Sequence, residues 1–134
     1  MQGAIEKRGA VGIAWFDNPP VNAISHEVRQ GLMAAIDTAV SDREIKALII
    51  ACRGRTFMAG ADITEFGSSP KPPGLPDVVM AMSESPILKV AAIFGTTLGG
   101  GFETALACDY RIAQSGSKVG LPEVKLGILA GAHG

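Results

Sequence analysis

The sequence is poor in aromatic residues, in cysteine and histidine, and in excess charge of either sign. Of its 134 residues 5% are aromatic, two are cysteine and two are histidine, and the net charge is −1. A chain without a basic footprint is not expected to bind nucleic acid or an anionic membrane surface. Its longest apolar runs fall far short of the ~20 residues that a membrane-spanning helix needs. We therefore expect neither nucleic acid nor membrane as a partner.

The two cysteines and the N-terminal segment indicate a reducing compartment. Cys52 and Cys108 are too far apart in the sequence for a CxxC or zinc-ligand spacing. We expect both to be buried, reduced thiols of an intracellular, cytoplasmic protein. The N-terminal segment carries Glu6 and no long apolar stretch, so no secretory signal is predicted. No His, Cys and Asp cluster offers metal ligands, and no metal site is expected.

What the chain does have is glycine, with 17 residues, and small apolar residues in a 47% apolar composition. The core must then be assembled from Ala, Val, Ile and Leu. Ser25 is a plausible N-cap for a helix running to about Val40. Its apolar positions recur at helical spacing, and Arg29 is expected to lie off that stripe, on the polar side.

The remaining pattern alternates between strands and helices. Apolar runs predict strands over 11–16, 45–50, 90–94 and 110–113, helices over 77–85 (capped by Asp77) and 102–108, and a short extended segment over 118–121. This alternation predicts an α/β layer fold. Lys89, beside an otherwise apolar strand, is unusual, and we expect its long side chain to snorkel towards solvent.

Two segments carry no regular pattern. Residues 67–76 hold four prolines, which predicts a mobile surface loop that is either a plain connector or a lid. Residues 127–134 are glycine-rich and no element follows them, whereas domains usually end in a docked element or a short tail. We therefore expect residues 1–134 to be an incomplete domain, truncated at the C-terminus.

Loops that follow predicted strands are the usual location of sites in α/β proteins, and one of them holds three consecutive glycines. Residues 99–101 match neither GxGxxG after the first strand nor the P-loop pattern, which disfavours a nucleotide cradle. A helix that begins near Gly100 would instead offer free N–H groups to an oxyanion. The alternative is tight helix–strand packing that needs small residues.

Two acids lie near these loops. Glu103 would lie in the first turn of the helix among apolar residues, and Glu123 follows Pro122 between Leu121 and Val124. Separately they could be a helix N-terminal acid and an exposed loop acid. Together they could form a pair for general acid–base catalysis. A Ser-His-Asp hydrolase is disfavoured because the sequence has no GxSxG elbow.

Four motifs carry a resemblance to a known family. They are NPPVNA at 18–23, FMAGADI at 57–63, GTTLGGGFETALACDYRIA at 95–113 and VGLPEVKLGIL at 119–129. In this order they resemble the enoyl-CoA hydratase/isomerase (crotonase) family. They are most similar to the N-terminal hydratase part of multifunctional fatty-acid β-oxidation enzymes that also carry a 3-hydroxyacyl-CoA dehydrogenase. The resemblance implies a crotonase-like spiral of ββα turns.

The resemblance also implies a ligand and roles for site residues. The ligand would be an acyl-CoA thioester, with no metal or redox cofactor. Glu103 and Glu123 match the two catalytic glutamates, and the backbone N–H groups of Ala61 and Gly100 would form an oxyanion hole. The CoA site would be lined by Ala59, Asp62 and Ile63. Members are typically homotrimers or hexamers, or are fused to a dehydrogenase.

Because both acids are present, the resemblance favours hydration of 2-enoyl-CoA to 3-hydroxyacyl-CoA. One alternative is an isomerase or other acyl-CoA chemistry, which would need only one acid. Another is a catalytically silent acyl-CoA-binding fragment. The sequence departs from the family at Ala130, where proline is usual, and at His133, where glycine or arginine is usual.

Overall fold

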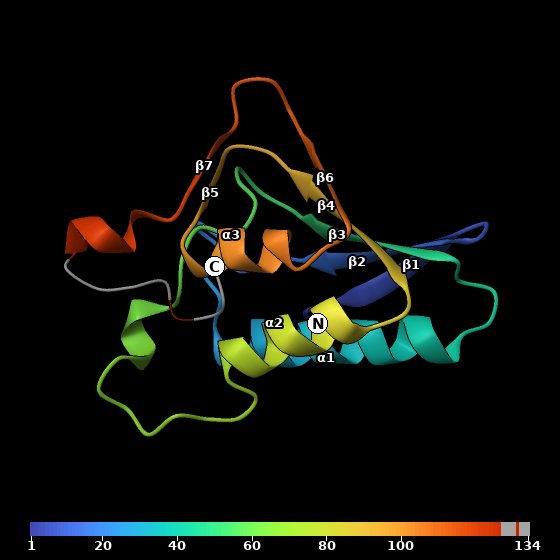
Figure 1. The fold of residues 1–134 in the computed structure, drawn as a ribbon, viewed down its shortest axis with the longest axis horizontal. Helices are drawn as coiled ribbons and strands as arrows, with labels where there is room; N and C mark the ends of the chain where they lie inside the picture. The colour runs from blue at the N-terminus through green and yellow to red at the C-terminus, as the bar shows by residue number, and fades with distance from the viewer. Residues whose placement is uncertain (127–130, 132–134) are drawn as a thin grey trace.

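The structure, a computed structural model, describes residues 1–126 and residue 131. Its larger sheet has five strands in the order β1 (Ala4–Arg8), β2 (Val11–Phe16), β3 (Ala47–Cys52), β4 (Leu88–Ile93) and β6 (Tyr110–Ala113). β1 pairs with β2 antiparallel, and every other pair in this sheet is parallel. The predicted α/β class is confirmed, because helices connect the parallel strands (Figure 1).

The strands of a second, smaller layer alternate along the chain with the last strands of the larger sheet. β5 (Thr96–Leu98) and β7 (Lys118–Gly120) pair in parallel. Two isolated parallel bridges extend this layer, from Ile24 to Ala61 and from Ala59 to Leu98. The segments that follow β2, β3, β4 and β6 therefore lie side by side. Each turn of the chain passes from the large sheet through this layer, as a ββα spiral requires.

In the described part of the chain there are three α-helices and two short 3-10 helices: α1 (His26–Ser41), α2 (Leu75–Glu84), α3 (Gly100–Leu106), η1 (Ile63–Glu65) and η2 (Pro122–Leu126). α1 and α2 lie side by side against one face of the sheet (Figure 1). Ser25 caps α1 as predicted, since its hydroxyl accepts a hydrogen bond from the Val28 amide. No helix of the described chain is long and apolar enough to cross a bilayer.

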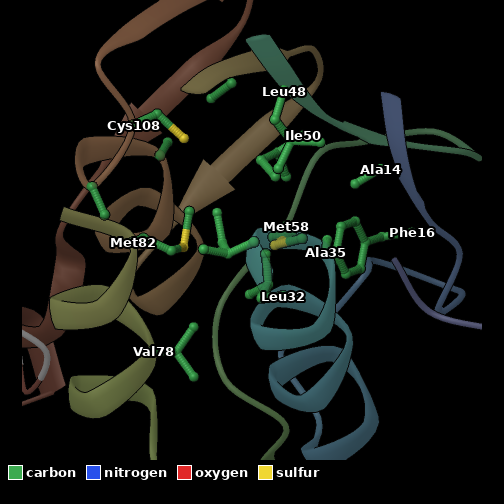
Figure 2. Packing of buried hydrophobic residues seen from close by; sticks show 14 of the residues in the cluster. Ala14, Phe16, Leu32, Ala35, Leu48, Ile50, Met58, Val78, Met82 and Cys108 are labelled. Carbon is green, nitrogen blue, oxygen red and sulfur yellow. The ribbon is translucent and has the colours of Figure 1, made fainter. Parts of the chain in front are cut away.

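The core lies between the sheet and the helices. Figure 2 shows Met58 among side chains of β3 and α1, including Ile50 and Leu32, all of them buried. α3 packs against the same segment at Gly101, because a Cβ there would overlap the carbonyl oxygen of Met58. The glycine therefore lets the start of α3 approach the 57–58 backbone, which places α3 beside the short second layer.

Several sequence-based expectations were wrong. β1 was not predicted, because an edge strand that carries the charged residues Glu6, Lys7 and Arg8 lacks the apolar pattern of a buried strand. α2 begins at Leu75 with Gly74 as its N-cap rather than being capped by Asp77, and Pro76 fits its first turn.

Two basic side chains are also placed differently from the prediction. Arg29 is buried with the apolar face of α1, at 9% exposure. Lys89 is 1% exposed and does not snorkel, because its ammonium donates to the carbonyls of Ser85 and Ile87. The glycine-rich loop expected over 127–134 lies outside the described residues, except for residue 131.

Candidate active site

Glu103 is a buried acid in the first turn of α3. The residue is 3% exposed, and its amide donates to the carbonyl of Gly99 at 2.9 Å, which fixes it one turn from the N-cap. Its Oε1 atom is buried and has no hydrogen-bond partner among the described residues. An unpartnered carboxyl oxygen is costly to bury, which is typical of a site that receives a polar ligand.

Glu123 reaches the same N-cap from η2. A Cβ at Gly99 would lie 3.4 Å from Oε1 of Glu123 and 3.7 Å from its Cδ, so the carboxyl group lies against the Gly99 backbone. Oε1 is buried and lacks a hydrogen-bond partner in the described part of the chain, so the exposed loop acid considered above is not what the structure has. Gly99 adopts φ +55°, and its amide donates to Gly120 at 3.0 Å. The Glu123 carboxyl group therefore lies at the N-cap of α3, and Glu103 lies one helical turn after it.

The two candidate oxyanion amides belong to neighbouring segments of the second layer. The Gly60 amide donates to Leu98 at 2.9 Å, and the Ile24 amide donates to Gly60 at 3.0 Å. Ala59 and Leu98 form a parallel bridge, and Ala61 and Gly100 each come two residues after their member of this pair. Within residues 1–126, neither the Ala61 nor the Gly100 amide has an acceptor.

The three residues expected to line a CoA site lie in or beside the 59–61 segment. Ala59 is held by its amide, which donates to Val21 at 3.1 Å. Asp62 accepts from the hydroxyl of Thr64 at 2.7 Å and from its amide at 3.0 Å, and these bonds hold the pKa of Asp62 below its usual range. Ile63 is 75% exposed.

A cavity of about 340 Å³ lies beside this segment. Ala61 and Asp62 are among its lining residues, together with Arg29 and Glu65, whereas the two candidate acids are not. The structure thus brings Ala61 and Asp62 to one cavity, places the Glu123 carboxyl group at the N-cap of α3, and places Glu103 in the first turn of that helix. Gly100 follows that N-cap directly.

Sequence reasoning missed Arg29 and Glu65, which form an ion pair at 2.8 Å beside the cavity. The spacing of Arg29, Leu32 and Ile36 by three and four residues is the signal that would have placed the arginine on the buried face. Segment 67–76 is not a free connector, because Arg29 binds carbonyls within it.

Comparison with known proteins agrees with the motifs. The family model for enoyl-CoA hydratase/isomerase matches residues 6–134. The chain is 43% identical over 125 residues to the peroxisomal bifunctional enzyme of Danio rerio, covering 93% of this chain and 17% of that protein. It is 42% identical over 136 residues to the fatty acid oxidation complex subunit alpha of Acinetobacter baylyi, covering 92% and 19%. The chain therefore spans less than a fifth of the length of these relatives.

The fold agrees as well. The solved structure of an enoyl-CoA hydratase from Bacillus anthracis superposes with a TM-score of 0.87 at 26% identity, covering 96% of this chain and 54% of that one. The crotonase-like spiral expected from the motifs is thereby confirmed. The family model and the relatives agree on one conclusion: this chain belongs to the enoyl-CoA hydratase/isomerase family.

Proposed function

We propose that this chain carries the reaction centre of an enoyl-CoA hydratase, which adds water to 2-enoyl-CoA to give 3-hydroxyacyl-CoA in fatty-acid β-oxidation. The observation that carries the proposal is the pair formed by Glu103 and Glu123. Each has a buried Oε1 atom without a partner among the described residues, the Glu123 carboxyl group lies against the Gly99 N-cap, and Glu103 lies one turn later in α3. Two acids with buried carboxyl oxygens at the start of one helix can divide the roles of base and acid.

In the proposed reaction, Glu103 takes a proton from water while the water oxygen bonds to the β-carbon of the enoyl thioester. The π electron pair of the double bond moves towards the thioester carbonyl, which gives an enolate. Glu123 then donates its proton to the α-carbon, and the enolate collapses to the thioester. Transfer of the proton from Glu103 to Glu123 restores the starting state, so no cofactor besides the CoA thioester substrate is proposed.

The enolate oxygen would accept hydrogen bonds from the amides of Ala61 and Gly100. Two observations support this assignment. Both amides lack an acceptor in residues 1–126, and each comes two residues after the parallel bridge between Ala59 and Leu98. Donors aimed at charge that develops in the transition state lower the barrier, and removing one such donor costs about 3–4 kcal/mol. Ala59, Asp62 and Ile63 would contact the CoA portion, beside the cavity that Ala61 and Asp62 line.

The test is hydration of crotonyl-CoA by the whole protein, followed by loss of enoyl-thioester absorbance. Glu103→Gln and Glu123→Gln should each lower kcat by about 10²–10⁴-fold, because each removes one proton-transfer group. Glu44→Gln is a matched control, since Glu44 is an exposed acid that pairs with Lys7 far from Gly99. Equal turnover in wild type and Glu123→Gln would overturn the acid–base assignment.

The same variants separate hydration from the alternatives. An isomerase needs one acid, so it would tolerate Glu103→Gln while shifting the double bond of a 3-enoyl-CoA. A silent acyl-CoA binder would bind CoA in calorimetry without turnover. The cytoplasmic location expected from the sequence stays a prediction, because relatives such as the Danio rerio enzyme carry a peroxisomal name.

A further inference from the structure

Arg29 binds three parts of the chain at once from the buried face of α1. Its guanidinium pairs with Glu65 at 2.8 Å, and its Nε donates to the carbonyl of Pro73 at 2.8 Å. One Nη donates to Lys71 at 3.3 Å and the other to Ile24 at 3.4 Å. Glu65 is the first residue of segment 65–74 and Pro73 is the last but one, and the segment runs from the end of η1 to the start of α2. Arg29 therefore ties both ends of this segment to α1.

The first end of the segment continues from the candidate oxyanion amide. The Ile24 carbonyl that accepts from Arg29 also accepts from the Asp62 amide at 3.4 Å, and Ile24 bridges Ala61. The other carboxyl oxygen of Glu65 accepts from the His26 amide at 2.7 Å. The turn that follows Ala61 is thus hydrogen-bonded at Asp62 to Ile24, just before α1, and at Glu65 to His26, the first residue of α1.

The second end of the segment leads to the other candidate amide. Leu75 comes two residues after Pro73, and its Cδ2 would lie 2.7 Å from a Cβ placed on Gly100. Leu75 therefore covers the first residue of α3 directly. Because only Gly74 separates Pro73 from Leu75, movement of the Pro73 carbonyl away from Arg29 would carry Leu75 away from Gly100.

In this cluster the Arg29 guanidinium is paired with the Glu65 carboxylate. Burial would raise the pKa of Glu65, but the hydrogen bonds from Arg29 and the His26 amide outweigh it, and the pKa lies below its ordinary value. The ring Nε2 of His26 lies 2.9 Å from the Pro72 carbonyl, which can only accept, so this nitrogen carries the proton in that contact. Arg29 is 9% exposed, and the planar fork of donors in its guanidinium suits several acceptors at fixed angles.

We infer that Arg29 is a positioning residue whose guanidinium holds segment 65–74, so that Ala61 keeps its place beside Ile24 and Leu75 stays packed on Gly100. The inference rests on the proposed hydratase function for its effect on rate, and on the contacts alone for its effect on the segment. A lysine cannot satisfy it, since one ammonium on a flexible stem does not reach both the Glu65 carboxylate and the Pro73 carbonyl with fixed geometry.

The experiment compares wild type, Arg29→Gln, Arg29→Lys and Glu65→Gln in the whole protein. Hydrogen exchange by mass spectrometry should show amides in 62–75 exchanging at least tenfold faster in Arg29→Gln, with β3 and β4 unchanged. Crotonyl-CoA hydration should lose at least tenfold in kcat, with KM changed less, because the Ala61 amide acts on the transition state. Arg29→Lys should recover less than a third of the wild-type kcat. If Arg29→Gln does not fold, Glu65→Gln, which changes a half-buried side chain, should likewise speed exchange in 62–75 and lower kcat.

Ile36→Val is the matched control, because it trims a buried side chain on the same helix and lowers stability without touching the segment. It should leave exchange in 62–75 and kcat within twofold of wild type. Unchanged exchange in both Arg29→Gln and Glu65→Gln overturns the inference, and so does faster exchange with unchanged kcat. If wild type does not hydrate crotonyl-CoA while exchange responds as expected, the proposed function fails and the role of Arg29 in holding segment 65–74 stands.

Discussion

One carboxylate oxygen of Asp109 binds Lys89 twice. Oδ2 accepts from the Lys89 backbone amide at 2.8 Å and lies 3.3 Å from its ammonium. The ammonium also donates to Ser85, the C-cap of α2, and to Ile87. The start of β4, the end of α2 and the residue before β6 are therefore joined through a lysine that is 1% exposed. Cations suit the free carbonyls at a helix C-terminus.

We expect Asp109→Asn to destabilise the fold by about 1–2 kcal/mol. The loss of a charged acceptor leaves a buried ammonium with carbonyl partners only, and the cost is discounted because the Asp109 side chain is 45% exposed. Urea unfolding measures it. Asp37→Asn, at an exposed position of α1, is the control and should change stability by less than ~0.5 kcal/mol. Equal stability of the two variants would contradict a structural role for the pair.

Gly99→Ala should lower both stability and hydration. The positive φ of +55° is unfavourable for alanine by about 1–3 kcal/mol, and the new Cβ would meet Glu123 at 3.4 Å. Gly9→Ala is the matched control, because Gly9 has a similar φ of +59° and nothing lies within 4 Å of the added Cβ. Both variants should lose stability in thermal unfolding, but only Gly99→Ala should lose kcat. A loss of kcat in Gly9→Ala as well would show that the effect is global.

Segment 65–74 should open in acid. Because the pKa of Glu65 is lowered in the folded protein, its contribution is fully present above its ordinary value of 4.5 and is lost as pH falls through the lowered value. Arg29 faces this carboxylate and keeps its charge, and the nearby Asp62 carboxylate opposes the shift. The protection of amides in 62–75, which is the intrinsic exchange rate at each pH divided by the observed rate, should therefore fall below about pH 4.5 in wild type. Glu65→Gln should show low protection at every pH, and a parallel pH profile of protection in both proteins would contradict the assignment.

Both thiols should be unreactive in the native protein. Burial raises the pKa of Cys52 and of Cys108 to about 12. At pH 8 on the order of one thiol in ten thousand is then ionised, and the thiolate is the reactive form. A disulfide reagent should label neither cysteine on the timescale on which it labels both in urea. Labelling of one thiol in the folded protein at the rate of a free cysteine would contradict this burial.

The local elements were predictable because their signals are local. The Ser25 cap and the apolar stripe that follows it determine α1, and a continuous apolar run determines β3. β1 was not predictable from its own residues, since an edge strand with charged side chains owes its conformation to pairing with β2. The motifs, read as a family resemblance, pointed to Glu103 and Glu123 without showing that Glu123 lies at the N-cap of the helix that carries Glu103.

The sequence by itself determined the class of fold, the family and the candidate acids, because periodicity, caps and motif residues are written in neighbouring positions. Only the tertiary structure decided that Glu123 lies against Gly99, that Arg29 is buried, and that its guanidinium holds both ends of segment 65–74. These contacts join residues 24 to 44 positions apart, and the energy that selects them comes from burial and pairing of charged groups, which no local pattern records.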